Sequence, residues 1–212
     1  MFTFLISDMV CIFPLFIILG FLFWIISRIA GRRGSGVHIF GVTLFSCILG
    51  MIFNITGLPD FLGESIEIGN CNFNFIPFKD LGTSPFQYIA NLILFIPVGF
   101  CIPVLWRKMS RLYEVLLTGF FLSFCIEFLQ MFTFRAVDVD DLIMNTLGTL
   151  AGFALYMLAR RLFPHFISRF TASEHNRLWY SGGWLITLTG TLLLCLFIVP
   201  IQYNFIYSLV FG

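Results

Sequence analysis

The sequence predicts an all-α membrane protein, a polytopic bundle of about six transmembrane helices that forms one membrane domain over residues 1–212. Three observations lead to this fold class. First, 59% of the residues are hydrophobic and only 11% are charged, whereas an average soluble domain carries roughly 25% charged residues. Second, the apolar residues gather in stretches of membrane length. Third, the Lys and Arg residues gather in alternate linkers between those stretches.

This composition excludes several classes of protein. With so few charges the chain cannot cover a globular surface with ionised groups, which excludes a soluble enzyme and a disordered regulator. Twelve Lys and Arg against 11 Asp and Glu leave a net charge of +1, and a nucleic-acid binder would need a strongly basic surface. We therefore expect no nucleic-acid partner and a protein whose surroundings are membrane lipid.

Six apolar stretches are each close to the roughly 20 residues that one membrane span requires. The first has Asp8 before it and Arg28, Arg32 and Arg33 after it, which is the reverse of a cleaved signal peptide, so we expect it to remain as a helix. The stretches are Val10–Ile29, Val37–Leu58, Tyr88–Trp106, Tyr113–Phe132, Leu142–Phe163 and Gly183–Tyr203.

The linkers differ sharply in charge. Ten of the 12 basic residues follow the first, third and fifth stretches, whereas the other linkers are acidic and hold only Lys79 and Arg135 as basic residues. Because Lys and Arg concentrate in cytoplasmic loops, both termini are predicted to be extracytoplasmic. The longest loop, residues 59–87, is then external to the cell membrane.

Polar residues inside the spans are the candidates for function, since a carboxylate at membrane depth is costly and usually functional. Apart from Glu114 at the inner edge of the fourth stretch, Glu127 is the only acidic residue inside a predicted span. Gly119, Ser123, Glu127 and Gln130 follow spacings of four, four and three residues, which places them on one face of a helix.

The next predicted span repeats this arrangement with Asp141, Asn145, Gly148 and Gly152. The two glycines form a GxxxG pattern, which allows close approach of helix backbones. We expect the two stripes to face each other across antiparallel neighbours and to form a polar pocket that opens outward.

Three more residues belong near this end of the bundle. Asn91 lies near the outer end of the third stretch, and Asp138 and Asp140 lie in the loop before Asp141. Asp141 is expected to cap the helix that follows, and Asp140 is interpreted as part of a solvated loop.

The order of these motifs resembles the VanZ-like family. The motifs are Asn74-Phe75-Ile76-Pro77-Phe78, Asn91-x3-Phe95-x-Pro97-x-Gly99, Ser123-x3-Glu127-x2-Gln130 and Arg135-x2-Asp138-x-Asp140-Asp141-x3-Asn145-x2-Gly148-x3-Gly152. The resemblance covers a core of about residues 74–158. Its namesake is a membrane protein associated with resistance to the glycopeptide antibiotic teicoplanin in Gram-positive bacteria.

The resemblance implies a set of polar positions that all fall at the predicted outer end. Together with the residues found above, they form the expected ligand-binding pocket, and no catalytic residue is assigned. The candidates are Asn74, Asn91, Glu127, Gln130, Arg135, Asp138, Asp141 and Asn145.

Two functions remain open at this point. One is the binding of a drug, a lipid or a lipid-linked cell-wall precursor in support of teicoplanin-type resistance, where the acyl chain of such drugs suits a Phe-rich site. The other is an intramembrane enzyme that modifies an envelope lipid or precursor through its carboxylates. We expect no cofactor and no metal, although hard oxygen ligands of this kind would suit Mg²⁺ or Ca²⁺ in the enzymatic alternative. A transporter is less favoured, because the sequence shows no inverted repeat and, apart from Glu114 at the inner edge of the fourth stretch, no acidic residue lies in the inner half of any predicted span.

The predicted orientation can be tested by cysteine accessibility in intact cells. After replacement of the native cysteines, Glu64→Cys should react with a membrane-impermeant maleimide, because residue 64 lies in the predicted external loop. Arg161→Cys should react only after the membrane is permeabilised. Labelling of position 161 from outside would reverse the topology.

Overall fold

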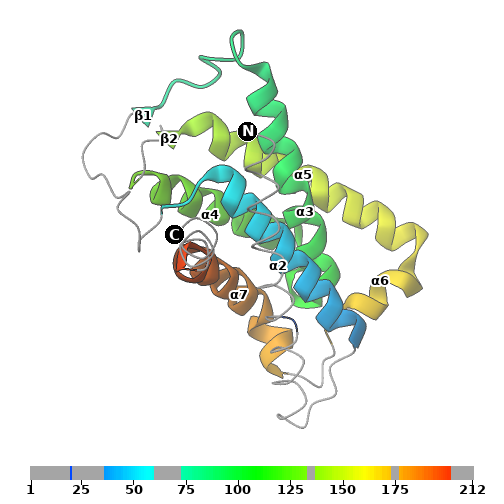
Figure 1. The fold of residues 1–212 in the computed structure, drawn as a ribbon. Helices are drawn as coiled ribbons and strands as arrows, with labels where there is room; N and C mark the ends of the chain where they lie inside the picture. The colour runs from blue at the N-terminus through cyan, green and yellow to red at the C-terminus, as the bar shows by residue number, and fades with distance from the viewer. Residues whose placement is uncertain (1–19, 21–35, 60–72, 133–136, 173–176, 202–212) are drawn as a thin grey trace.

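The structure of the chain is a computed structural model that describes residue 20 and residues 36–59, 73–132, 137–172 and 177–201 (Figure 1). Within these residues, five helical segments are long and apolar enough to cross a membrane. The prediction of an all-α membrane bundle is therefore confirmed, and a sixth span at Val10–Ile29 lies outside the described residues apart from Gly20. The helices are α2 (Gly36–Thr56), α3 (Pro85–Leu105), α4 (Leu112–Gln130), α5 (Val139–Leu162) and α7 (Arg177–Leu193), which a π-helix at Leu194–Ile198 extends.

Local chemistry sets where these helices begin. Helix α3 starts at Pro85, where the fixed φ of proline suits the first helical turn and its missing N–H leaves nothing unpaired. Helix α4 starts after Arg111, whose backbone N–H donates to the Glu114 carboxylate at 3.3 Å. The cap of α5 is Asp138 rather than Asp141, so this helix begins three residues before the predicted Leu142.

A short helix and a pair of strands were not predicted from the sequence. A short helix, α6 (Pro164–Phe170), follows α5 and turns back toward the end of α3. Two very short strands, β1 (Phe73–Asn74) and β2 (Val137–Asp138), pair in parallel, with Asn74 opposite Asp138. Strands of two residues carry too little hydrophobic periodicity to be recognised in a sequence.

Helices α3 and α5 make the closest contact of the bundle. A Cβ atom added at Gly152 would lie 2.0 Å from the carbonyl oxygen of Ile96. A Cβ at Gly148 would lie 2.1 Å from the carbonyl oxygen of Leu92, and one at Gly99 would lie 1.9 Å from that of Thr149. The glycine stripe of α5 therefore faces α3, which corrects the expectation that it faces the Glu127 helix.

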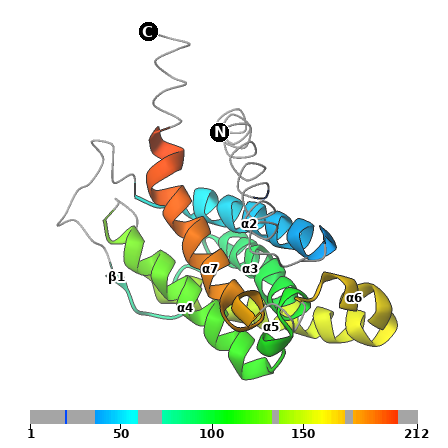
Figure 2. The ribbon, with the colours of Figure 1, turned by 90° about the horizontal axis from the view of Figure 1, so that it is seen from below.

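Helix α4 meets α5 through different residues. Gly119 of α4 lies against the side chain of Thr149, and Ser123 of α4 lies against Asn145. Around these contacts the apolar core joins α2, α3 and α4, with Phe45, Phe95 and Trp106 fully buried in it. Figure 2 shows α7 beside α2 and α4, completing the bundle.

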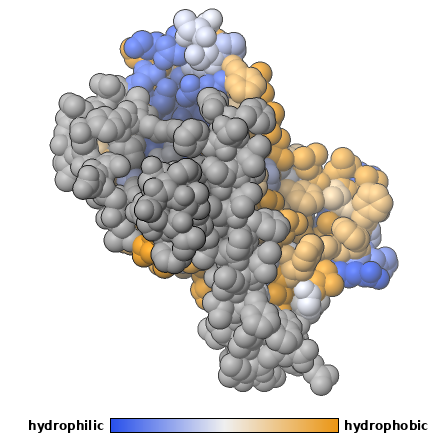
Figure 3. All heavy atoms as spheres, viewed as in Figure 1, coloured by the Kyte–Doolittle hydropathy of each residue, from blue (hydrophilic) through white to orange (hydrophobic). Residues whose placement is uncertain are grey.

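The alternating direction of the helices brings the connecting segments to two ends of the molecule (Figure 1). The ends of α2 and α4, the starts of α3 and α5 and both strands meet at one end. The turn between α3 and α4, and helix α6, lie at the other. Figure 3 shows hydrophilic surface at both ends and hydrophobic surface between them, as expected for a bundle that crosses a bilayer.

The backbone contact between α3 and α5 predicts a large cost for one added methyl group. Gly152→Ala should destabilise the protein by about 1–3 kcal/mol, since the atoms that its Cβ meets belong to the backbone and cannot move aside. The measurement is the midpoint of thermal unfolding in detergent. Gly190→Ala in α7 is the control: its Cβ meets nothing within 4 Å, so it should be neutral or gain up to about 1 kcal/mol. Equal effects of the two variants would contradict the contact.

Candidate functional site

Seven of the eight candidate residues lie at the end of the bundle where α4 finishes and α5 begins. The eighth, Arg135, lies outside the described residues. The strand pair explains how Asn74 arrives there, because its pairing places Asn74 directly opposite Asp138. The amide nitrogen of Asn74 lies 3.3 Å from both carboxylate oxygens of Asp138.

Asp138 connects three elements at this end. Its side chain accepts a hydrogen bond of 3.0 Å from the backbone N–H of Asp140 and so caps α5. Its own backbone N–H donates to Oε2 of Glu127 in α4 at 3.1 Å. With the bond from Asn74, this one residue links the strand β1 and the ends of two membrane helices.

Glu127 is buried, with 5% of its surface exposed. Its position one turn before the end of α4 directs the carboxylate at the start of α5, where the N–H groups of the first turn are free to donate. Asp138 and Asp141 lie close enough to repel it electrostatically. Arg135, the predicted cationic partner, falls in residues 133–136, outside the described part of the chain.

Two asparagines extend the site along α5. Asn91 of α3 donates its amide N–H to Oδ1 of Asp141, and Gln87 donates to the same carboxylate. One turn deeper, the amide nitrogen of Asn145 donates to the Ser123 hydroxyl at 2.9 Å. Oδ1 of Asn145 is buried and has no hydrogen-bond partner among the described residues.

Gln130 points in a different direction from the carboxylates. Its amide nitrogen donates to the carbonyl oxygen of Thr56 at 2.7 Å, at the last residue of α2. That carbonyl belongs to the final turn of a helix and lacks an intrahelical donor. Gln130 thus joins α4 to α2 at the same end of the bundle.

Asp140 is buried, which corrects the interpretation from the sequence that it belongs to a solvated loop. Only 2% of its surface is exposed, and its carboxylate accepts hydrogen bonds of 2.8 Å from the backbone N–H of Phe78 and from the Tyr88 hydroxyl. Phe78 has a φ of 60°, a left-handed conformation that costs a residue with a side chain roughly 1–2 kcal/mol. The buried carboxylate holds this strained segment against the start of α3.

Sequence reasoning missed Gln87, Tyr88 and Asp140. A usable signal existed for the first two, because residues 87, 88 and 91 share one face of α3 at spacings of three and four. The role of Asp140 depends on a bond to a backbone N–H 62 residues away, and no local pattern carries that information.

The result is a cluster that we call the acidic network: Glu127, Asp138, Asp140 and Asp141. Its described donors are backbone N–H groups, amides and one phenol, all neutral. Within the described residues, no group of three or more His, Cys, Asp or Glu is arranged to hold a metal ion. Two cavities, of about 490 Å³ between α4 and α7 and about 560 Å³ beside α6, lie away from the network and have none of its residues in their walls.

Asp140→Asn tests the anchoring of the segment before α3. Asparagine removes the negative charge and one of the two acceptor oxygens, so the charge-assisted hydrogen bonds from the Phe78 N–H and the Tyr88 hydroxyl become weaker. We expect a loss of about 1–3 kcal/mol in the free energy of unfolding, measured by thermal unfolding in detergent. Asp80→Asn, at an exposed position of the same segment, should have little effect. A fully stable Asp140→Asn protein would show that these bonds are dispensable.

Comparison with known proteins places this chain in a family. Residues 43–160 match the VanZ/LLP1 family model, a match that begins earlier than the predicted core and includes most of α2. Protein VanZ of Enterococcus faecium is 32% identical over 91 residues, which are 42% of this chain and 55% of that protein. The chain thus spans about half the length of this curated relative, and no solved structure matches it. Because the family model matches more than half of the 212 residues, the chain belongs to the VanZ/LLP1 family of membrane proteins.

Proposed function

We propose that this protein supports resistance to glycopeptide antibiotics of the teicoplanin type by binding an envelope ligand at the acidic network. The observation that carries the proposal is the concentration of four carboxylates, on α4, α5 and the strand before it, at one end of a membrane bundle. A fold has no general need for such a cluster, because neighbouring carboxylates repel each other and burial raises the cost.

The chemistry of the network indicates the kind of group that it would bind. Carboxylates accept hydrogen bonds and attract positive charge, so a ligand with ammonium or amide N–H groups would relieve their repulsion. The unpartnered Oδ1 of Asn145 offers one further acceptor nearby. Drugs and cell-wall precursors that contain peptide groups carry donors of this kind.

Apolar side chains near the network suit a ligand with a lipid part. Phe75 and Ile76 follow Asn74 directly, and 72% and 62% of their surfaces are exposed. Exposed apolar residues beside a polar site at a bundle end favour a partner that lies partly in the bilayer. An acylated glycopeptide or a lipid-linked precursor in the outer leaflet would have both features.

The test is Glu127→Gln in a teicoplanin-sensitive Gram-positive host. Glutamine can still accept the Asp138 N–H bond, so the helix end should keep its geometry while the negative charge is lost. We expect the inhibitory concentration of teicoplanin to fall to that of cells without the protein. Quantification of membrane-inserted protein must show equal amounts.

A matched control comes from the same helix. Glu114→Gln makes the same change at the other end of α4, where the carboxylate is partly exposed and its partners among the described residues are Arg111 and Tyr113. It should retain resistance. Full resistance in Glu127→Gln, or equal loss in both variants, would remove the acidic network from the function. A glycopeptide without an acyl chain, tested in parallel, distinguishes recognition of the drug's lipid part from protection of a precursor.

A further inference from the structure

A second polar feature lies at the opposite end of the bundle from the acidic network. A cavity of about 560 Å³ opens between the end of α3, the last turns of α5 and helix α6. The residues in its wall include Pro103, Arg107, Tyr156, Arg160, Ser168 and Thr171. From Asn145 to Arg160 is 15 residues along α5, or about 22 Å at 1.5 Å per residue, so the two sites are separate.

Hydrogen bonds hold α6 in the position that creates this cavity. The backbone N–H of Ala172, just after α6, donates to the carbonyl oxygen of Leu105 at 2.8 Å. The Thr171 hydroxyl donates to the carbonyl oxygen of Val104 at 3.0 Å, and His38 Nδ1 lies 2.6 Å from the carbonyl oxygen of Phe170. Helix α6 is thereby fixed to the end of α3 and the start of α2, and the cavity has three defined walls.

Among the described wall residues, the charged side chains are both basic. Arg107 comes from the turn after α3 and Arg160 from the last turn of α5. Arg160 donates through Nη1 to the hydroxyl of Tyr156 at 3.2 Å, and only 3% of Tyr156 is exposed. The buried phenol thus orients one guanidinium, which leaves its remaining N–H groups for an anion. Arginine presents these donors in a planar fork that matches the oxygens of a phosphate group.

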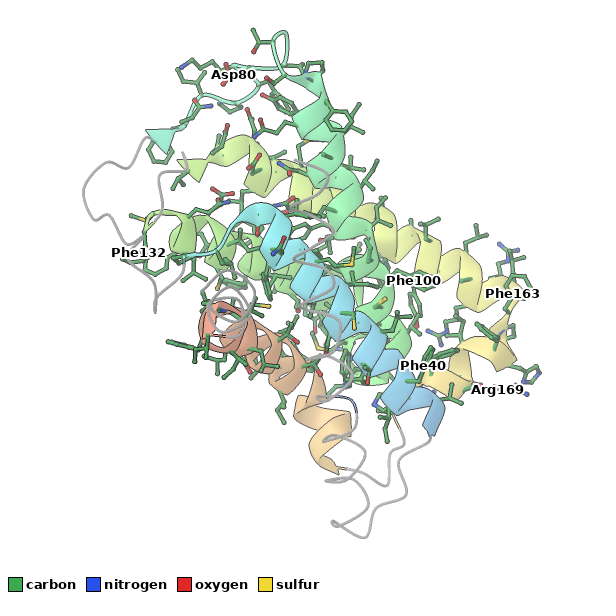
Figure 4. The ribbon with its side chains drawn as sticks, in the orientation of Figure 1. Phe40, Asp80, Phe100, Phe132, Phe163 and Arg169 are labelled. Atoms are coloured by element: carbon green, nitrogen blue, oxygen red, sulfur yellow. The ribbon has the colours of Figure 1, made fainter. Side chains whose placement is uncertain are left out.

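The surroundings indicate where such a phosphate would come from. Leu162 and Phe163, just before α6, and Phe166 within it are 59%, 62% and 59% exposed. His165 and Arg169 on the same short helix are also exposed. Figure 4 shows Phe163 and Arg169 at the two ends of α6, and Figure 3 shows hydrophobic surface directly beside hydrophilic surface there. Exposed aromatic and basic residues together are typical of the boundary between the hydrocarbon and the lipid headgroups.

We propose that this cavity binds the phosphate of an anionic glycerophospholipid, with Arg160 and Arg107 as the phosphate ligands and Tyr156 as a positioning residue. The glycerol and acyl chains would lie along the exposed apolar residues of α6. This site is independent of the function proposed for the acidic network. A lipid bound in the cavity would anchor this end of the bundle in the leaflet that contains anionic lipid.

The experiment is native mass spectrometry of the full chain in detergent, titrated with phosphatidylglycerol, phosphatidylcholine or diacylglycerol. Phosphatidylglycerol should be retained most strongly. The double variant Arg107→Gln/Arg160→Gln should retain it at least about tenfold less, since charge-assisted hydrogen bonds to a phosphate are lost. Tyr156→Phe should give a smaller loss, and its thermal unfolding midpoint shows whether the fold is intact.

The matched control is Arg161→Gln/Arg169→Gln, which removes the same charge from neighbouring exposed positions that are not in the cavity wall. It should retain phosphatidylglycerol as the unaltered protein does. Equal loss in the two double variants would overturn the proposal in favour of general attraction between basic residues and anionic lipid. Displacement of the lipid by millimolar inorganic phosphate would overturn the assignment to a lipid, because the cavity would then prefer a soluble phosphate.

Discussion

The contact between the backbones of α3 and α5 is the constraint on which the rest of this structure depends. Gly99, Gly148 and Gly152 allow the two helices to approach until carbonyl oxygens of one lie where a Cβ of the other would be. Inside a bilayer the hydrophobic effect does not drive helices together, so close packing of small residues is a main source of attraction between them. This pair forms the centre of the bundle, and α2 and α4 pack around it.

The same contact determines what happens at both ends of α5. At its start, the close approach brings Asn91 and Tyr88 of α3 against Asp141 and Asp140, which turns a row of acidic residues into a network with defined partners. At its end, it brings Tyr156 and Arg160 beside the last turn of α3, where α6 closes a cavity around them. One helix pair therefore positions acidic side chains at one end of the molecule and basic side chains at the other.

The acidic network has two buried carboxylates, Glu127 and Asp140, and two partly buried ones, Asp138 and Asp141, without a salt bridge among the described residues. Each one accepts N–H or O–H groups from a different element: Glu127 from the α5 start, Asp138 from β1, Asp140 from the segment before α3, and Asp141 from α3 itself. These bonds compensate much of the lost hydration but leave the negative charges close together. The carboxylates therefore connect several elements and at the same time concentrate negative charge at this end of the bundle.

The sequence by itself determined the fold class, the approximate bounds of the described spans, the family and most of the residues at the polar end. These conclusions rest on hydropathy, on the rarity of polar residues inside apolar stretches and on the order of short motifs. Such properties belong to the sequence itself and do not depend on which helices pack against each other. Only the tertiary structure decided that the glycine stripe of α5 faces α3, that Asp138 rather than Asp141 caps α5, and that Asp140 is buried. The local sequence around a stripe of glycines or a loop aspartate is the same whichever element it packs against. The partner is determined by contacts between residues far apart in the chain. For the same reason the cavity beside α6 had no counterpart in the sequence, since its two arginines lie 53 residues apart and reach a common wall through the contact of α3 with α5, which α6 then closes.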